Sequence, residues 1–261
     1  MSGKDIAMIL VIDIGNTNVV VGCIDGEQTY FIERMSADKQ RTELEYAITL
    51  KNVLELYNIK PEELEGGIIS SVVPTLTTCI KQAAEKLLHR KLKVVGPGLK
   101  NGLRIKTDNP AQLGSDQVVN AVAALAEYKP PLIIIDMGTA TTVSVVNREG
   151  AYIGCLIMPG LKSAMESLVN STAQLTQVSL EAPKRLIGSN TSDCMKSGAI
   201  YGHASALDGL IVRIEEELGE RCTVVATGGL AAMVVPFCKH TIILEDDLLL
   251  KGLQIIYHKN L

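Results

Sequence analysis

The chain has 261 residues, of which 47% are hydrophobic and 3% aromatic, and its formal net charge is -4 at pH 7. This composition is typical of a folded protein with ample core for one large domain or two of ordinary size. It disfavours nucleic acid as a main partner, because no cluster of Lys and Arg is interleaved with aromatic residues.

Apolar runs are interrupted by residues such as Asp13 and Asp136, well before the ~20 residues that a membrane-spanning helix requires. We therefore expect no membrane partner, and the start of the chain has no long apolar region that would indicate a signal peptide. The six cysteines form no C-x-x-C pair, and most lie in apolar context, which is typical of reduced residues in a cytoplasmic protein. The four histidines are too scattered for a zinc site.

The first part of the chain reads as three strands followed by alternating helices and strands. The strands are expected to form a meander with a turn at Asp25-Gly26, and the helices show apolar residues at helical spacing. This order is typical of a mixed sheet with helices packed on it. The expected elements are strands at 8–12, 18–24 and 28–32, a helix at 41–57, a strand at 67–73, a helix at 75–89 and a strand at 93–95.

Residues 96–114 contain several Gly, Pro and Asn residues and are expected to form a loop. Ser115 then has the features of an N-cap for a helix that continues through Ala126. Strands are expected next at 132–135, 143–146 and 151–157, followed by a helix to about 169, a long helix after 191, a strand at 222–226, a short helix and a final helix at 248–257.

One short pattern occurs twice in the chain. Each copy is an apolar strand, an Asp-x-Gly turn with small hydroxyl or amide residues, and a second strand; the copies are Asp13-Ile14-Gly15-Asn16-Thr17-Asn18 and Asp136-Met137-Gly138-Thr139-Ala140-Thr141-Thr142. A carboxylate at a strand end can organise a metal, and glycine allows backbone N–H groups to approach a phosphate. Either copy alone also fits an ordinary hairpin. The repetition favours two phosphate-binding turns, which a kinase would use to hold the tail of ATP between two lobes.

A third glycine-rich turn, Thr227-Gly228-Gly229, follows the strand at 222–226. Alone it is a weak signal, but its place after the two Asp-x-Gly turns favours contact with the nucleotide. The order of motifs resembles the two-lobed actin, hexokinase and heat-shock-70 fold, a ribonuclease H-like α/β architecture of duplicated mixed sheets flanked by helices. We expect an N-terminal lobe at 1–118 and a C-terminal lobe at 119–261, with Asp13, Asp116 and Asp136 converging on one cleft.

The motifs also carry a resemblance to one family over essentially the whole chain, from 8 to about 255. Besides the two Asp-x-Gly turns and the Thr-Gly-Gly turn, the matching segments are Gly114-Ser115-Asp116, Pro159-Gly160-Leu161 and residues 168–175. In this order they resemble the type III pantothenate kinases, which are similar to the Bvg accessory factor proteins. The resemblance implies a homodimeric transferase that phosphorylates the 4′-hydroxyl of pantothenate with ATP, as the first step of coenzyme A biosynthesis. It also implies a divalent ion such as Mg²⁺ and a monovalent cation, K⁺ or NH₄⁺.

The resemblance assigns roles to particular residues. Asp13 and Asp136 would be metal-binding, Asp116 would accept the proton of the attacking hydroxyl, and Thr172 would reach the substrate of the partner subunit. The nucleotide-binding residues would be Asp13, Gly15, Asn16, Thr17, Asn18, Gly138, Thr139, Thr141, Thr142, Thr227, Gly228 and Gly229, of which the second-turn residues would also help to place the monovalent cation. The substrate-binding residues would be Gly114, Ser115, Asp116, Gln117, Thr107 and Thr172.

The chemistry of phosphoryl transfer agrees with these roles. The reaction requires an aligned hydroxyl, a proton acceptor and neutralisation of the charge on the transferred group. The chain has no Walker-type G-K-[ST] sequence, so magnesium and backbone N–H groups would supply most of that neutralisation. An Asp at the start of a helix is more often a cap than a base, but the position of Asp116 between the expected lobes favours the base.

The chain departs from the family pattern, which reads Gly-Ala-Asp-Arg where this chain has Gly114-Ser115-Asp116-Gln117, and which has a Tyr where this chain has Thr107. Loss of the arginine removes a fork that binds carboxylates, and one such contact is worth ~1.5–3 kcal/mol. Two alternatives therefore stay open: a paralogue that phosphorylates another hydroxylated small molecule, and a weakly active ATP-binding regulatory dimer. The three intact carboxylates disfavour the second.

A stripe of small residues, Gly198, Gly202, Ala206 and Gly209, lies on one side of the expected long helix. Such a stripe permits close packing against a core or against a partner in a dimer, which we favour over a role in ligand binding.

Overall fold

The computed structural model describes residues 8–26 and 28–261 and divides the chain into two compact units. The first unit comprises the residues up to Leu103 together with Asn109–Ala123 and Asp247–Leu261; the second comprises Arg104–Asp108 and Ala124–Asp246. The expected lobes were continuous, with a division at residue 118. In the structure the short segment Arg104–Asp108 belongs to the second unit, and the longer segment Asp247–Leu261 belongs to the first. Amphipathic spacing predicts a helix there, but it does not specify which sheet the helix covers.

A mixed sheet of five strands, in the order β3-β2-β1-β4-β5, forms the centre of the first unit. The strands β1, β2 and β3 are antiparallel, which confirms the predicted meander, and β4 and β5 continue the sheet in parallel from β1. Their bounds are β1 Ile9–Ile14, β2 Asn18–Ile24, β3 Thr29–Ser36, β4 Gly66–Ser71 and β5 Lys93–Val94. Because β1 is longer than expected, Asp13 lies within the ladder, opposite Val20, rather than after it.

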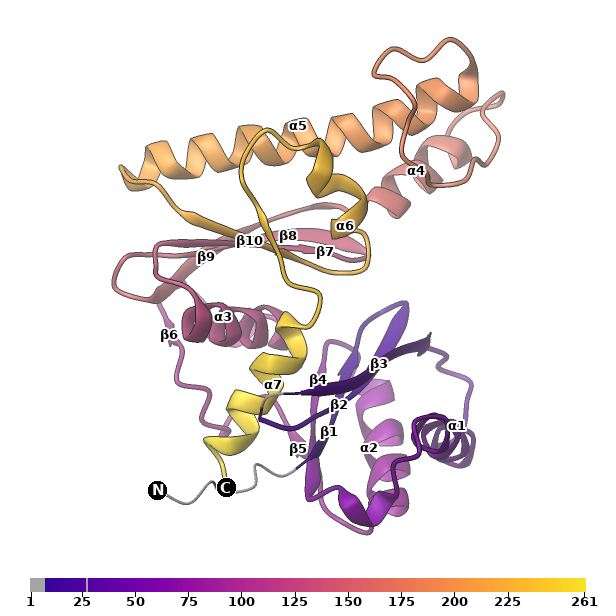
Figure 1. The fold of residues 1–261 in the computed structure, drawn as a ribbon, viewed down its shortest axis with the longest axis vertical. Helices are drawn as coiled ribbons and strands as arrows, with labels where there is room; N and C mark the ends of the chain where they lie inside the picture. The colour runs from indigo at the N-terminus through magenta and orange to yellow at the C-terminus, as the bar shows by residue number, and fades with distance from the viewer. Residues whose placement is uncertain (1–7, 27) are drawn as a thin grey trace. The chain divides into compact units, whose positions relative to one another are not determined.

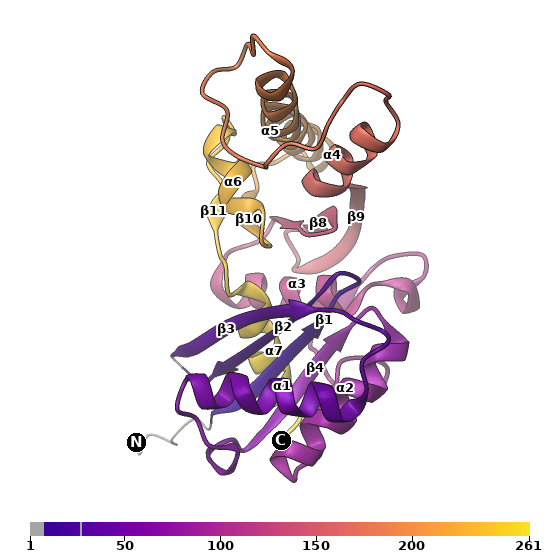
Figure 2. The same cartoon turned by 90° about the vertical axis from the view of Figure 1, so that its right-hand side faces the viewer.

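Helices cover both faces of this sheet, as Figure 2 shows: α1 (Glu43–Leu56) and α2 (Pro74–Leu88) lie on one face and α7 (Leu248–His258) on the other. A 3₁₀ turn at Pro61–Glu63 precedes β4. The start of α1 is fixed by a capping box, in which Thr42 and Glu45 satisfy each other's backbone N–H groups. The core between the sheet and α1 and α2 includes Leu10, Ile12, Ile14, Val21, Tyr46, Leu50, Leu76 and Ile80, all of which are buried.

The second unit is built on a six-stranded sheet in the order β11-β10-β7-β8-β9-β6. Its strands are β6 Arg104–Ile105, β7 Leu132–Met137, β8 Ala140–Val146, β9 Ala151–Pro159, β10 Thr223–Thr227 and β11 Ile243–Leu244. The strands β7, β8 and β9 are antiparallel neighbours, and β10 is parallel to β7. This arrangement repeats β1, β2, β3 and β4 of the first unit.

The long helix α5 (Thr191–Leu218) runs along one face of this second sheet (Figure 1). Its buried residues Ile200, Leu207 and Ile211 pack with Ile135 and Val143 of the strands. The unit also contains α4 (Leu161–Asn170), α6 (Ala231–Val234) and a 3₁₀ turn at Val235–Phe237. The expected helices after 160 and 191 are confirmed, and α5 is capped at its C-terminal end by Gly219, a residue in the left-handed conformation.

The helix α3 (Ser115–Glu127) follows the expected loop at 96–114, which contains the short strand β6 and a 3₁₀ turn at Pro110–Gln112. Ser115 was expected to cap this helix. Instead it is the first helical residue, and its hydroxyl bonds to the end of β4. The N-cap expectation was wrong because strand groups 44 residues away in sequence compete for that hydroxyl. Within 8–26 and 28–261, no helix has the length and apolar character needed to cross a membrane.

Candidate active site

The first Asp-x-Gly turn, residues 13–18, connects the end of β1 to the start of β2 in the first sheet. Asp13 is half-buried, whereas the remaining residues of β1 are buried and Asn16, Thr17 and Asn18 are exposed. The turn is closed by a hydrogen bond from the Gly15 N–H to the Asn18 carbonyl, with a distance of 2.9 Å. Exposed amide and hydroxyl side chains therefore follow a half-buried carboxylate near the end of the strand.

The second Asp-x-Gly turn, residues 136–142, connects β7 to β8 in the same way. The N–H of Gly138 donates to the Ala140 carbonyl at 3.0 Å, and Asp136 is the half-buried residue of an otherwise buried strand. The pattern of burial along β7 and β8 is the same as along β1 and β2. In both turns the glycine N–H closes the hairpin, so phosphate oxygens would be bound by other donors of the turn.

A hydroxyl residue lies beside each Asp on the neighbouring parallel strand. Asp13 is in register with Ser70 of β4, and Asp136 is in register with Thr227 of β10. Ser70 and Thr227 are buried. Neighbours in register present their side chains on the same face of a sheet. Each Asp-x-Gly turn is therefore a three-strand assembly.

The third turn packs directly against the second. Gly228 has a φ of +94°, and a Cβ built on it would be 2.6 Å from the Met137 backbone nitrogen. On the other side, the Gly160 N–H donates to the Thr139 carbonyl at 3.2 Å, and the Ser163 hydroxyl donates to the same carbonyl at 2.9 Å. A Cβ at Gly160 would be 2.4 Å from the Gly138 oxygen. The glycines of both flanking segments thus permit the close approach that holds this turn in place.

Two threonines of the second turn lie on opposite faces of the sheet. Thr142 is opposite Asp136 and shares its face, whereas Thr141 is opposite Met137, which packs in the core. Thr141 is fully buried, and its Oγ1 has no hydrogen-bond partner among the described residues. Of the two, Thr142 is the one placed beside the Asp136 carboxylate.

Asp116 lies in the first turn of α3, in the first unit. Its Oδ1 accepts a hydrogen bond from the N–H of Gln117 at 2.8 Å. The side chain also lies over Gly114, where a Cβ would be 2.4 Å from Oδ1. Burial raises the pKa of the Asp116 carboxyl, although hydrogen bonds from the backbone N–H groups of Gln117 and Asp116 oppose this shift. A carboxylate with a raised pKa is a better proton acceptor, as a general base requires.

The remaining expected substrate residues are distributed between the two units. Gln117 is buried in the first unit, with an exposed fraction of 9%. Thr107 lies in the second unit directly after β6, where the Lys106 N–H donates to the Tyr152 carbonyl at 2.8 Å. Thr172 is exposed just after α4, and its hydroxyl donates to the Leu168 carbonyl at 3.0 Å.

The expected residues are therefore divided between the two units. Asp13, Gly15, Asn16, Thr17, Asn18, Gly114, Ser115, Asp116 and Gln117 belong to the first unit, and Thr107, Asp136, Gly138, Thr139, Thr141, Thr142, Thr172, Thr227, Gly228 and Gly229 to the second. Asp13 and Asp116 belong to the first unit and Asp136 to the second, so their expected convergence on one cleft stays a prediction.

Sequence reasoning missed the hydroxyl residues at the end of β4, namely Ser70, Ser71 and Thr77 of the adjoining α2. The available signal was the Ser-Ser pair directly after the apolar run of a buried strand. Among residues 8–26 and 28–261, no three His, Cys, Asp or Glu side chains gather as a metal site. Magnesium in a kinase site needs no such group, because one or two carboxylates and the substrate phosphates hold it.

Comparison with known proteins shows the family. A family model described as type III pantothenate kinase matches residues 9–213. The type III pantothenate kinases of Halalkalibacterium halodurans and Geobacter sulfurreducens are 40% and 41% identical to this chain over 253 residues. In each case the match covers 97% of this chain, and it covers 100% and 99% of those proteins respectively.

Two solved structures show the fold. A Baf family transcriptional activator from Campylobacter jejuni has a TM-score of 0.56 and 19% identity, over 97% of this chain and 98% of that chain. MreB 5 of Spiroplasma citri, bound to AMPPNP, also has a TM-score of 0.56, with 10% identity over 97% of both chains. These similarities confirm the predicted α/β fold class, and the sequence relatives carry the assignment further: the chain belongs to the type III pantothenate kinase family.

Proposed function

We propose that this protein transfers the γ-phosphoryl group of ATP to the 4′-hydroxyl of pantothenate, the first step of coenzyme A biosynthesis. The observation that carries the proposal is that the residues shared with this family occupy matching strand-end turns in both units. The two Asp-x-Gly hairpins have the same register and the same burial, and each Asp has a buried hydroxyl residue beside it on a parallel strand. Two such turns provide two separate sets of donors and carboxylates for a phosphate chain.

In this proposal Asp13 and Asp136 bind magnesium, and the exposed residues Asn16, Thr17, Asn18 and Thr139 bind phosphate oxygens. Carboxylate, amide and hydroxyl oxygens are the ligands that a hard divalent cation prefers, so the residues present fit Mg²⁺. When bound with ATP, magnesium neutralises charge on the phosphates. Thr227, Gly228 and Gly229 bind the nucleotide from the turn that packs on Asp136.

A monovalent cation, K⁺ or NH₄⁺, fits the second turn. Asp136, Thr142 and Thr227 lie at neighbouring register positions on one face of the sheet and carry only oxygen ligands. We assign the ion to this position. The full burial of Thr141 in the core makes Thr142 the better ligand of the two threonines.

Asp116 acts as the general base. Its carboxylate accepts the proton of the pantothenate 4′-hydroxyl as the oxygen attacks the γ-phosphorus. Gly114, Gln117 and Thr107 bind the acceptor, whereas the Ser115 hydroxyl is bonded to the end of β4 and serves to position this segment. The raised pKa of Asp116 supports its role as the base, because burial makes the carboxylate a better proton acceptor than an exposed aspartate.

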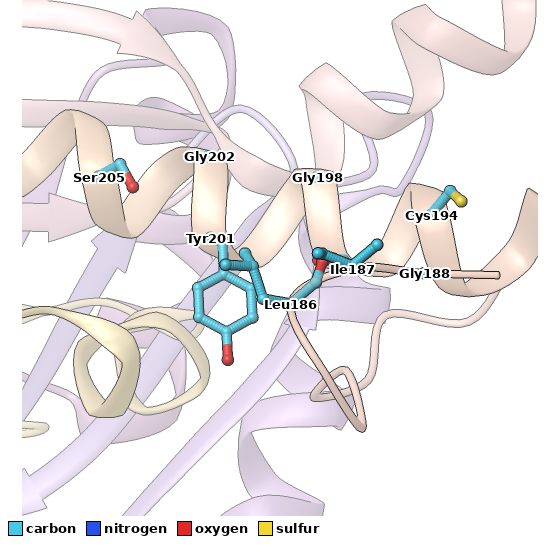
Figure 3. Close-up of a pocket in the computed structure, with 9 residues that line it drawn as sticks. Leu186, Ile187, Gly188, Cys194, Gly198, Tyr201, Gly202 and Ser205 are labelled. Carbon is cyan, nitrogen blue, oxygen red and sulfur yellow. The ribbon is translucent and has the colours of Figure 1, made fainter.

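We further propose that the protein is a cytoplasmic homodimer in which α5 lies at the interface and Thr172 reaches the acceptor of the partner subunit. Built Cβ atoms at Gly198, Gly202 and Gly209 meet no described heavy atom within 4 Å. Packing within one chain therefore does not account for the small-residue stripe. A pocket of about 470 Å³ lies along the same helix (Figure 3).

Exposed apolar side chains support this interface. Leu186 and Ile187 precede α5 and line the pocket beside it, and they are 59% and 79% exposed. In the same unit, Ile157 at the end of β9 is 69% exposed and Leu168 of α4 is 43% exposed. A partner chain would cover such residues.

The test is an assay of the purified protein with ATP, Mg²⁺ and K⁺, with pantothenate as acceptor and mass spectrometry of the product. Formation of 4′-phosphopantothenate supports the proposal, and omission of K⁺ and replacement by Na⁺ tests the cation. Hydrolysis of ATP without a phosphorylated acceptor, or phosphorylation of another hydroxylated compound alone, contradicts it. Replacing Asp13 with Asn is the inactive control.

A further inference from the structure

The hydroxyl of Ser115 makes three contacts with the end of β4. Its Oγ accepts a hydrogen bond from the Ser71 N–H at 3.0 Å and donates to the Ser71 carbonyl at 3.0 Å. It also lies 3.0 Å from the Ser70 hydroxyl. A serine hydroxyl has one proton and two lone pairs. Since the proton of Ser115 is given to the Ser71 carbonyl, Ser70 is the donor in the third contact, and the capacity of Ser115 is used completely.

This contact takes the place of a strand. The ladder between β4 and β5 ends where the Val95 N–H donates to the Ile69 carbonyl, at 2.8 Å. In a parallel ladder, the next pair of groups that β4 presents on that side belongs to Ser71. One side chain from α3 therefore satisfies both the N–H and the carbonyl that a longer β5 would have satisfied.

A second layer of hydroxyl contacts holds Ser71 itself. The Ser71 side chain accepts from the Val73 N–H at 3.0 Å and from the Thr77 hydroxyl at 2.7 Å. Thr77 lies in α2, so the start of that helix is fixed to the same strand end. The position to which Ser115 is attached is therefore rigid.

The contacts of Ser115 connect two carboxylates of the site. Asp13 is in register with Ser70, whose hydroxyl bonds to Ser115, and Asp116 is the next residue along α3. Ser70 is fully buried, so no water competes for this path from the first Asp-x-Gly turn to the base. The family pattern has alanine at this position, so the hydroxyl is a feature of this chain and not of that pattern. We propose that in this chain Ser115 is a positioning residue, which fixes the base Asp116 relative to Asp13 by replacing a strand at the end of β4.

This inference rests on the proposed function, because it assumes that Asp116 is the base. A displacement of about 1 Å at a reacting group lowers turnover by about 100-fold. Ser115→Ala should therefore lower kcat by about 10-fold to 100-fold, with KM for ATP changed less than about twofold, since the nucleotide turns are untouched. Ser115→Thr keeps the hydroxyl and should restore most of kcat.

A matched control separates positioning from stability. Thr42 is also a hydroxyl at a helix start in the first unit, and its side chain accepts from the Glu45 N–H in the capping box of α1. Thr42→Ala should lower the melting temperature and leave kcat unchanged. If Ser115 were only structural, Ser115→Ala would behave in the same way.

The pH profile gives a further readout. A looser first turn of α3 exposes Asp116 to water, so the acid limb of kcat should move to lower pH in Ser115→Ala. Ser70→Ala leaves both contacts between Ser115 and Ser71 in place, so it should show a smaller loss of kcat than Ser115→Ala. If Ser115→Ala does not fold, Ser70→Ala provides the test of the proposal. Wild-type kcat and pH profile in both variants would overturn the proposal, whereas a wild-type protein that forms no phosphopantothenate would instead overturn the proposed function.

Discussion

The carboxylate of Asp136 lies against Gly228, since a Cβ at position 228 would be 2.7 Å from Oδ1 of Asp136. The φ of Gly228 is +94°, in the region that L side chains rarely adopt. Gly228→Ala should therefore lower stability by about 1–2 kcal/mol through the backbone and also displace the carboxylate. We expect ATP binding to weaken by about tenfold, which equals about 1.4 kcal/mol. Calorimetric titration with ATP and Mg²⁺ measures this.

Gly219 provides the control for this variant. It has a φ of +72° at the end of α5, and a Cβ built there meets no described heavy atom within 4 Å. Gly219→Ala should lower stability through its strained backbone conformation and leave the affinity for ATP unchanged. Equal affinities in the two variants would show that the contact with Asp136 does not matter for the nucleotide.

Replacement of Asp116 by Asn should preserve ATP binding and lower turnover by about 10²–10⁴, because only the capacity to accept a proton is lost. Steady-state kinetics with ATP and pantothenate measure the turnover, and ATP titration supplies the control. Near-normal turnover would exclude Asp116 as the base. The pH dependence of kcat provides a second check. As pH falls through the raised pKa of Asp116 the base is protonated, so kcat should begin to fall at a pH above the ordinary Asp pKa of about 3.9.

The same raised pKa predicts an effect of Asp116 on stability. A carboxyl whose pKa is higher in the folded than in the unfolded protein contributes stability that is present at low pH and is lost as pH rises through the folded-state value. At neutral pH, Asp116→Asn should therefore leave stability unchanged or raise it while activity falls. Thermal unfolding at pH 7 and pH 4 distinguishes this from general damage, which would lower stability at both.

Asp208 has the opposite pKa shift and predicts a loss of stability in acid. Burial would raise its pKa, but hydrogen bonds from the backbone N–H groups of Lys239 and His240 and from the His240 ring outweigh burial and lower it. The stability from these contacts is therefore present above about pH 3.9 and is lost as pH falls through the lowered value. Asp208→Asn should cost about 1.5–3 kcal/mol at pH 7 and flatten this acid dependence, as urea unfolding at several pH values would show. A parallel pH dependence in both proteins would contradict it.

The interface on α5 predicts the response to a charge. Gly202→Glu introduces a carboxylate where one chain leaves open space, so the isolated subunit should fold normally while dimerisation fails. Light scattering at micromolar concentration should change from dimer to monomer. Turnover should fall with it, because Thr172 then has no partner to reach. A monomeric wild-type protein would remove the shared site.

The acceptor positions predict a gain of function. Thr107→Tyr together with Gln117→Arg should lower KM for pantothenate by about 10-fold to 100-fold, through one charge-assisted contact of ~1.5–3 kcal/mol, and leave KM for ATP nearly unchanged. Because Gln117 is buried, the single variants and their melting temperatures are needed beside the double variant. If pantothenate is already used efficiently, or if KM does not improve, these two residues are not what limits acceptor binding.

The hairpins of the two Asp-x-Gly turns could be predicted from sequence because their signals are local. Alternating apolar residues, the Asp-x-Gly sequence and the repetition lie within short segments. The contacts of Ser115 were not predictable in the same way, because they depend on how α3 meets β4. In the sequence, a serine before a helix indicates a cap. Only the folded chain shows that β5 ends before it reaches Ser71, which leaves the Ser71 backbone groups for Ser115.

The placement of α7 also could not be derived from its sequence. Its apolar spacing predicts the helix, but its partners are set by glycines elsewhere. A Cβ at Gly22 of β2 would be 2.4 Å from Leu250, and a Cβ at Gly66 of β4 would be 2.4 Å from the Tyr257 hydroxyl. These positions read from sequence only as weak points in strands, whereas in the structure they provide room for a helix from the other end of the chain.

The return of residues 247–261 to the first unit has a consequence for synthesis of the protein. Nearly all of the second unit is one continuous stretch, 124–246, so its core is complete as soon as that stretch has left the ribosome. The first sheet forms from residues made earlier, yet the face that α7 covers stays open until α7 itself has been made. We therefore expect the half of the molecule that is translated first to finish folding last. Until then, its uncovered strands are the part of the nascent chain most exposed to aggregation and most in need of a chaperone.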